Sequence, residues 1–113
     1  MGEYFDHDEI FPIIAECIRT KYRSKKDWVL HEEIVQCLMN DSEGAYLVQR
    51  AFRRWKSKPQ KSQVLEWRKT PQGWAGNMVA WFGQKITEHM SSYEKEFELT
   101  AQKPYGYKPK RIE

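Results

Sequence analysis

Apolar and polar residues alternate with a helical period over residues 70–93, the longest such pattern in the chain. Thr70 is a suitable N-cap for this helix, and Pro71 suits its first position because the N–H that proline lacks has no helical partner there. One half of the predicted helix is apolar and should face a core. Its residues are Trp74, Ala75, Met78, Val79, Trp81, Phe82, Ile86, Met90 and Tyr93.

The other half of this helix carries small and polar residues. They are Gly73, Gly76, Asn77, Ala80, Gly83, Gln84, Thr87, Glu88 and Ser91. A glycine inside a helix costs about 1 kcal/mol relative to alanine, so three glycines on one face indicate that something approaches this face closely. The approaching group is either nucleic acid or another helix of the protein.

The N-terminal part of the chain predicts a first helix. It begins in the acidic cluster at residues 6–9, where carboxylates favour a helix N-terminus, and runs to about Tyr22. Pro12 fits only in the first turn of such a helix. The apolar positions Ile10, Ile14 and Ile18 share one face and indicate a buried side.

Two further helices follow a short apolar segment. Residues 28–30 could form one rung of a small sheet and lead directly into a helical pattern over residues 31–40. Asp41 or Ser42 can cap a third helix that runs to about Trp55. We expect a three-residue turn between these two helices.

Two segments of irregular pattern complete the chain. Residues 57–69 form a long basic connection that could include a helical turn or a short strand, and a structureless loop of this length is uncommon unless functional. Residues 95–112 alternate in polarity around residues 103–106, where Pro104 and Gly106 fit the second and fourth positions of a type I turn. We therefore predict a C-terminal β-hairpin.

These elements predict a single domain over residues 1–113 that is mainly α-helical with a small β-hairpin. No segment approaches 18 apolar residues and the N-terminus is acidic, so we expect neither a transmembrane helix nor a signal peptide, and a cytoplasmic protein. Cys17 and Cys37 lie on the apolar sides of two predicted helices without a CxxC partner. We expect reduced, buried thiols in preference to a disulfide.

Charge is distributed unevenly along the chain. The net charge is only +3, but residues 50–69 hold eight basic residues and one acid, a local net charge of +7. Such a segment can attract a polyanion. Residues 1–49, by contrast, carry ten acids and five basic residues.

The order of helix, short strand, helix, helix, long helix and basic hairpin resembles the winged helix-turn-helix class. In detail, WVLHEEIVQCL looks like the short strand and second helix of such domains, and FELTAQKPYGYKPK looks like a wing with its tip at residues 103–106. The chain differs from the class at Leu30, where many members have a Ser or Thr cap. An additional helix and residues 57–69 also precede the candidate recognition helix.

The resemblance implies a winged-helix-like DNA-binding protein of regulatory function. The N-terminal half of the 70–93 helix would enter the major groove, with Asn77 and Gln84 as candidate base readers and Gln72 near a phosphate. Basic residues of the connection and the wing would neutralise the DNA backbone. They are Arg53, Arg54, Lys56, Lys58, Lys61, Arg68, Lys69, Lys103, Lys108, Lys110 and Arg111.

A second hypothesis makes the small-residue face a protein interface. Gly76, Ala80 and Gly83 have the spacing that lets another helix pack tightly, so the face could be an internal contact, a homodimer contact or the docking surface of an accessory module. Trp55 and Trp67 could also stack on unpaired bases, although a buried Trp with a basic neighbour is more common.

Catalysis has little support in the sequence. The three histidines show no metal-ligand spacing with either cysteine, and no glycine-rich phosphate loop follows a strand. We therefore expect no enzyme activity, no cofactor, no metal, no small-molecule substrate and no membrane partner.

Overall fold

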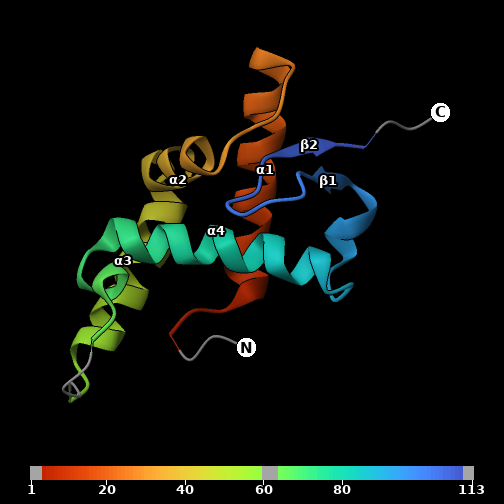
Figure 1. Cartoon of the computed structure of the whole chain (residues 1–113). Helices are drawn as coiled ribbons and strands as arrows, with labels where there is room; N and C mark the ends of the chain where they lie inside the picture. The colour runs from red at the N-terminus through yellow and green to blue at the C-terminus, as the bar shows by residue number, and fades with distance from the viewer. Residues whose placement is uncertain (1–3, 60–63, 111–113) are drawn as a thin grey trace.

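The computed structural model describes residues 4–59 and 64–110, which fold into helices packed around one core beside a small sheet (Figure 1). The α-helices are α1 (His7–Lys25), α2 (His31–Asn40), α3 (Ser42–Lys56) and α4 (Pro71–Thr87). Two 3-10 helices are η1 (Glu66–Lys69) and η2 (Ser92–Lys95), and the strands are β1 (Phe97–Leu99) and β2 (Tyr107–Pro109). The predicted fold class, mainly α with a β-hairpin, is confirmed.

Helix α1 starts at His7, within the predicted acidic cluster at residues 6–9. The Asp6 carboxylate accepts a hydrogen bond from the Asp8 N–H at 2.8 Å, which satisfies one of the free donors of the first turn. Pro12, however, is the sixth residue of the helix, so its predicted place in the first turn is wrong. The position tolerates proline because Pro12 and Asp8, whose carbonyl loses its helical donor, are both exposed to water.

Helices α2 and α3 follow each other almost without a break. The Leu30 N–H donates to the Glu33 carboxylate at 2.9 Å at the start of α2. Asp41 alone separates the helices, and its carboxylate accepts from the Gly44 N–H at 2.8 Å. The predicted three-residue turn is therefore wrong, because a single residue both ends α2 and caps α3.

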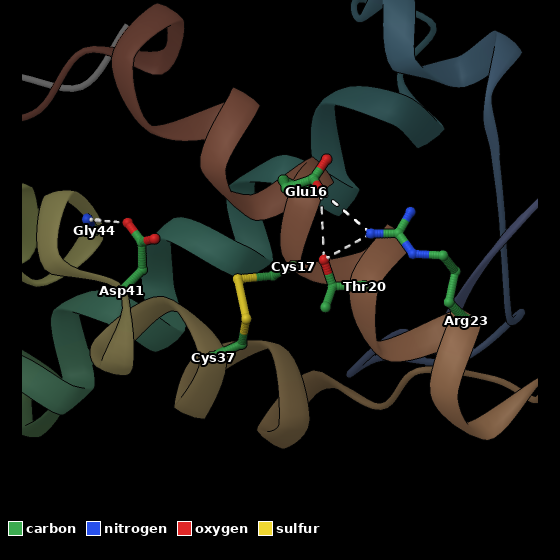
Figure 2. Close-up of a disulfide and its surroundings, with 7 residues drawn as sticks. All are labelled: Glu16, Cys17, Thr20, Arg23, Cys37, Asp41 and Gly44. Atoms are coloured by element: carbon green, nitrogen blue, oxygen red, sulfur yellow. Dashed lines mark hydrogen bonds and ion pairs between the residues drawn. A yellow bond between two sulfur atoms is a disulfide. The ribbon is translucent and has the colours of Figure 1, made fainter.

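A disulfide joins α1 to α2, in contrast to the predicted reduced thiols. Cys17 and Cys37 have Cα atoms 5.9 Å apart, within the range that a disulfide spans (Figure 2). The sequence places both residues on apolar faces, but only the packing of α1 against α2 brings these faces together. Arg23 lies nearby on α1 and donates to Glu16 and Thr20.

The sheet has the antiparallel hairpin β1–β2, in which Leu99 pairs with Tyr107. Val29 adds the predicted rung on the other side of β2, because its N–H and carbonyl exchange hydrogen bonds with Tyr107 at 2.8 and 2.9 Å. The hairpin connection comprises residues 100–106 and closes with a bond of 3.0 Å from the Thr100 N–H to the Gly106 carbonyl. The hairpin is thus not closed by the predicted four-residue turn.

Helix α4 crosses the middle of the molecule, with α3 at its N-terminal end and the hairpin beside its C-terminal half (Figure 1). The predicted apolar half is buried at Trp74, Ala75, Met78, Val79, Phe82 and Ile86. The Phe82 ring lies 5.2 Å from the ring of Phe11 and 5.9 Å from that of Tyr107. The same residue therefore links α1, α4 and the hairpin.

The predicted end of this helix at Tyr93 is wrong. Helix α4 stops at Thr87, and His89 takes a left-handed conformation with φ of 59°. Met90, predicted to be in the core, is therefore 66% exposed. Trp81, also predicted in the core, is 40% exposed on the edge of the apolar half.

Across the described residues, every helix is too short or too polar to span a lipid bilayer.

Candidate binding groove on helix α4

A groove of about 830 Å³ runs along the small-residue face of α4, and we call it the α4 groove. The floor consists of residues from α4, while the walls come from the start of α2, from η1 and from the hairpin connection. The floor and rim residues of α4 are Gln72, Gly73, Gly76, Asn77, Ala80, Trp81 and Gln84. The walls include His31, Glu32, Val35, Trp67, Thr70, Lys103, Pro104, Tyr105 and Tyr107.

The three glycines of this face have different surroundings. A Cβ atom at Gly73 would overlap the backbone carbonyl of Trp67 in η1. A Cβ atom at Gly83 would overlap the Tyr107 hydroxyl and would lie 2.6 Å from the Tyr105 ring. Gly73 and Gly83 therefore let η1 and the hairpin of the same chain approach α4.

Gly76 is different, because it opens onto the groove. The nearest atom to a Cβ atom built there is Nε2 of His31, at an ordinary contact distance of 3.7 Å. In the described part of the chain, no tight contact requires a glycine at this position. The close approach predicted for the small-residue face is thus made by η1 and the hairpin at its two ends, and the middle of the face is open.

Asn77 lies in this open part and is half-buried. Within the described parts of the chain its side-chain amide has no hydrogen-bond partner, so both a donor and an acceptor remain for a ligand. Gln72 is exposed one turn earlier, in the first turn of α4. Asn77 therefore meets the first requirement of a base reader, an amide that is not already engaged.

Gln84, the other predicted base reader, is engaged by neighbouring side chains. Its Nε2 donates to the Glu88 carboxylate at 2.6 Å, and its Oε1 accepts from Nζ of Lys103 at 2.7 Å. Bidentate pairing of Gln84 with a base would require both bonds to break. The same contact places Lys103 from the predicted wing directly on the rim of the α4 groove.

His31 stands opposite the floor, at the first position of α2. Burial lowers the pKa of this imidazole below its ordinary value, and the charge of Glu32 opposes the shift only in part. The neutral ring is therefore favoured near pH 7. Within the described residues the imidazole has no hydrogen-bond partner.

The basic residues predicted to contact phosphate are spread over several elements. Arg53, Arg54, Lys56 and Lys58 are exposed at the C-terminal end of α3 and beyond it, away from the groove walls. Arg54 donates to the Tyr4 carbonyl at 3.3 Å, and Nζ of Lys58 lies 5.0 Å from the centre of the Tyr4 ring. Lys56 lies over the Phe52 ring.

The remaining basic candidates lie in η1 and the hairpin. In η1, Arg68 lies over the Trp67 ring at 5.3 Å, and Lys69 forms an ion pair of 2.8 Å with Glu66. In the hairpin, Nζ of Lys108 lies 4.6 Å from the centre of the Trp28 ring, and Lys110 is exposed. The last two candidates, Lys61 and Arg111, lie outside the described residues.

Three cations elsewhere in the molecule illustrate pairing with acidic partners. Arg19 pairs with Glu96 at 2.5 Å, Lys25 pairs with Glu33 at 2.8 Å, and Arg50 pairs with Glu9. Over the residues that the structure describes, Arg53, Arg54 and Lys56 form no such pair with a carboxylate. Among the described residues, the end of α3 thus carries positive charge that no neighbouring carboxylate neutralises.

Sequence reasoning did not assign His31, Trp81 or Tyr105 to the site. The apolar pattern of α4 predicts Trp81 in the core, but Trp81 is exposed because it lies at the boundary of the two halves of the helix. His31 and Tyr105 reach the groove only through the packing of α2 and the hairpin on α4, and no local pattern carries that information.

Within the described residues, no three His, Cys, Asp or Glu side chains are close enough together to hold a metal ion. Comparisons of the chain with models of known protein families, with curated proteins and with solved structures found no match.

Proposed function

We propose that the chain is a winged-helix-like module that binds duplex DNA through α4, the hairpin and the basic end of α3, with a regulatory rather than a catalytic output. The open middle of the small-residue face carries the proposal. There, Asn77 presents a half-buried amide without a partner among the described residues, and Gly76 leaves room for close approach. The placement of Lys103 on the same rim supports the role of the hairpin as a wing.

Asn77 is the base reader in this proposal, because an amide can pair bidentately with adenine. Gln72 and the first N–H groups of α4 are available to a phosphate. Gln84 acts differently from its predicted role, since it holds Lys103 at the rim. Arg53, Arg54 and Lys56 supply exposed positive charge for the DNA backbone, and none of them pairs with a carboxylate of the described residues.

The proposed place of action is the cytoplasm. Cytosolic thiols are usually kept reduced, whereas Cys17 and Cys37 form a disulfide in this structure. Both the oxidised and the reduced protein should therefore be tested for DNA binding.

The direct test is a fluorescence anisotropy titration of mixed-sequence duplexes at two salt concentrations. Contacts to several phosphates predict that affinity falls steeply as salt rises from 50 to about 200 mM. A lack of binding at about 50 mM salt, or binding without a salt slope, would rule the proposal out.

Two variants separate base reading from backbone contact. Asn77→Ala should change sequence preference at one base pair by about 1–3 kcal/mol, whereas Arg53→Ala should weaken binding to all duplexes to a similar degree. Arg23→Ala is the matched control, because Arg23 is equally exposed but interacts with Glu16 on α1. Equal losses on every sequence for both test variants would show that Asn77 reads no base.

The second candidate is a non-enzymatic accessory module whose partner or second copy docks on the same face. The aromatic residues Trp67, Trp81 and Tyr105 in the groove favour this candidate. Light scattering tests the homodimer, since a mass that stays at the monomer value across concentrations excludes it.

A further inference from the structure

The α4 groove has the size of a small-molecule site. Its volume of about 830 Å³ falls in the range of about 300–1,000 Å³ that is typical of ligand pockets. Three separate elements wall it: the start of α2, η1 and the hairpin connection. A groove of this size can hold a small molecule as an occupant separate from DNA.

The charge inside the groove is nearly balanced. Lys103 is held by Gln84, and Glu32 is exposed at the outer edge. His31 favours its neutral form because burial lowers its pKa. The opposite formal charges of Lys103 and Glu32 thus offset each other in the lining, and a neutral ligand matches the groove better than an ion does.

The shape of the floor suits a flat ring. Gly76 has no side chain, so a planar group can lie against the helix backbone there. Trp81 and Tyr105 also line the groove, and aromatic rings prefer stacked or edge-to-face contact with another ring. A planar aromatic molecule would use both features.

The polar groups of the groove indicate which donor and acceptor atoms the ligand should carry at the edge of its ring. The Asn77 amide offers a donor and an acceptor, and the neutral His31 imidazole offers one of each. Neither group has a partner within the described residues. A ring that carries an N–H donor beside a ring-nitrogen acceptor, as in an aminopurine or aminopyrimidine, would satisfy them.

We infer that the α4 groove binds a small, neutral heteroaromatic molecule of this kind, and that its binding excludes duplex DNA from α4. The ligand site follows from the groove alone. The exclusion rests on the proposed function, because Asn77 would have to serve both the ligand and the DNA.

The first experiment measures binding of free adenine by ligand-observed NMR and by tryptophan fluorescence. We expect saturable binding to the wild-type protein, and at least tenfold weaker binding to Gly76→Leu, whose side chain fills the floor. Thr87→Leu is the matched control, because Thr87 is exposed on α4 outside the groove, and it should bind adenine as the wild type does. Benzoate, which is planar but anionic, should not bind.

Two outcomes of this experiment would overturn the inferred ligand site. A lack of saturation at about 5 mM adenine, where even a ~1 mM site would be mostly occupied, overturns the inference. Equal binding by Gly76→Leu and the wild type also overturns it. If circular dichroism shows that Gly76→Leu is unfolded, Asn77→Ala replaces it, with the same loss of adenine binding expected.

A second experiment adds adenine to the protein–duplex complex. Displacement of the duplex supports the exclusion, and simultaneous binding of both overturns it while the proposed function stands. Adenine binding without any duplex binding supports the ligand site and refutes the proposed function. Binding of single-stranded oligonucleotides but not of free adenine overturns the small-molecule site in favour of an unpaired base.

Discussion

The two faces of α4 come from the same helix but have opposite relations to the rest of the chain. The apolar face is buried along its centre, where Trp74, Met78 and Phe82 are at most 1% exposed, and Trp81 is exposed only at its edge. The small-residue face is covered only at its ends, where Gly73 meets η1 and Gly83 meets the hairpin. This difference shows that glycines in one row can have two roles. Gly73 and Gly83 allow other segments to pack against α4, whereas Gly76 lies on the open surface.

The largest effect is expected on the apolar face. Trp74→Ala removes a buried ring that contacts the rings of Tyr4 and Trp67 and leaves the Arg68 carbonyl without the indole N–H donor at 3.0 Å. We expect the free energy of unfolding to fall by about 3–5 kcal/mol in urea denaturation. A loss below about 1 kcal/mol would show that Trp74 does not belong to a packed core.

The next effect concerns the closed N-terminal end of the small-residue face. Gly73→Ala forces a methyl group into the Trp67 backbone carbonyl, which cannot rotate away as a side chain could. We expect destabilisation by about 3 kcal/mol, at the upper end of typical overpacking costs. Differential scanning calorimetry measures this effect, and an unchanged melting temperature would mean that η1 does not pack against α4.

A smaller effect is expected at His31, on the groove wall. Burial lowers its pKa in the folded protein, so below about pH 6.5 the unfolded chain binds more protons than the folded one. Stability should therefore fall as pH decreases through this range. His7, whose pKa burial also lowers, contributes in the same direction. Urea unfolding at several pH values measures the free energy of unfolding as a function of pH. This free energy should depend less on pH for His31→Gln than for the wild type. The same pH dependence in both proteins would show that His31 is not buried.

Much of the fold could be predicted because its signals are local. The acidic cluster at residues 6–9 and the cap Thr70 mark the starts of α1 and α4, and the alternation around residues 97–109 marks the hairpin. The end of α4 could not be predicted from local signals. Ile86, Met90 and Tyr93 continue the apolar spacing, but the chain leaves the helix at Thr87 and turns at His89.

The site was predicted less completely because it depends on contacts between distant segments. The pattern identified the small-residue face and Asn77, but it gave no means to distinguish Gly76 from Gly73 and Gly83. That distinction arises when the hairpin and η1 fold against α4. The disulfide was missed for the same reason, since only the packing of α1 on α2 brings Cys17 to Cys37.

The most direct test of the open middle of α4 compares the free energies of unfolding of Gly76→Ala and Gly83→Ala in urea. Gly76→Ala should be as stable as the wild type or up to about 1 kcal/mol more stable, because alanine favours the helix and meets no tight contact. Gly83→Ala should lose about 1–2 kcal/mol, because its methyl group displaces the buried Tyr107. Equal destabilisation of both variants would contradict the account, since it would show that the face is closed along its whole length.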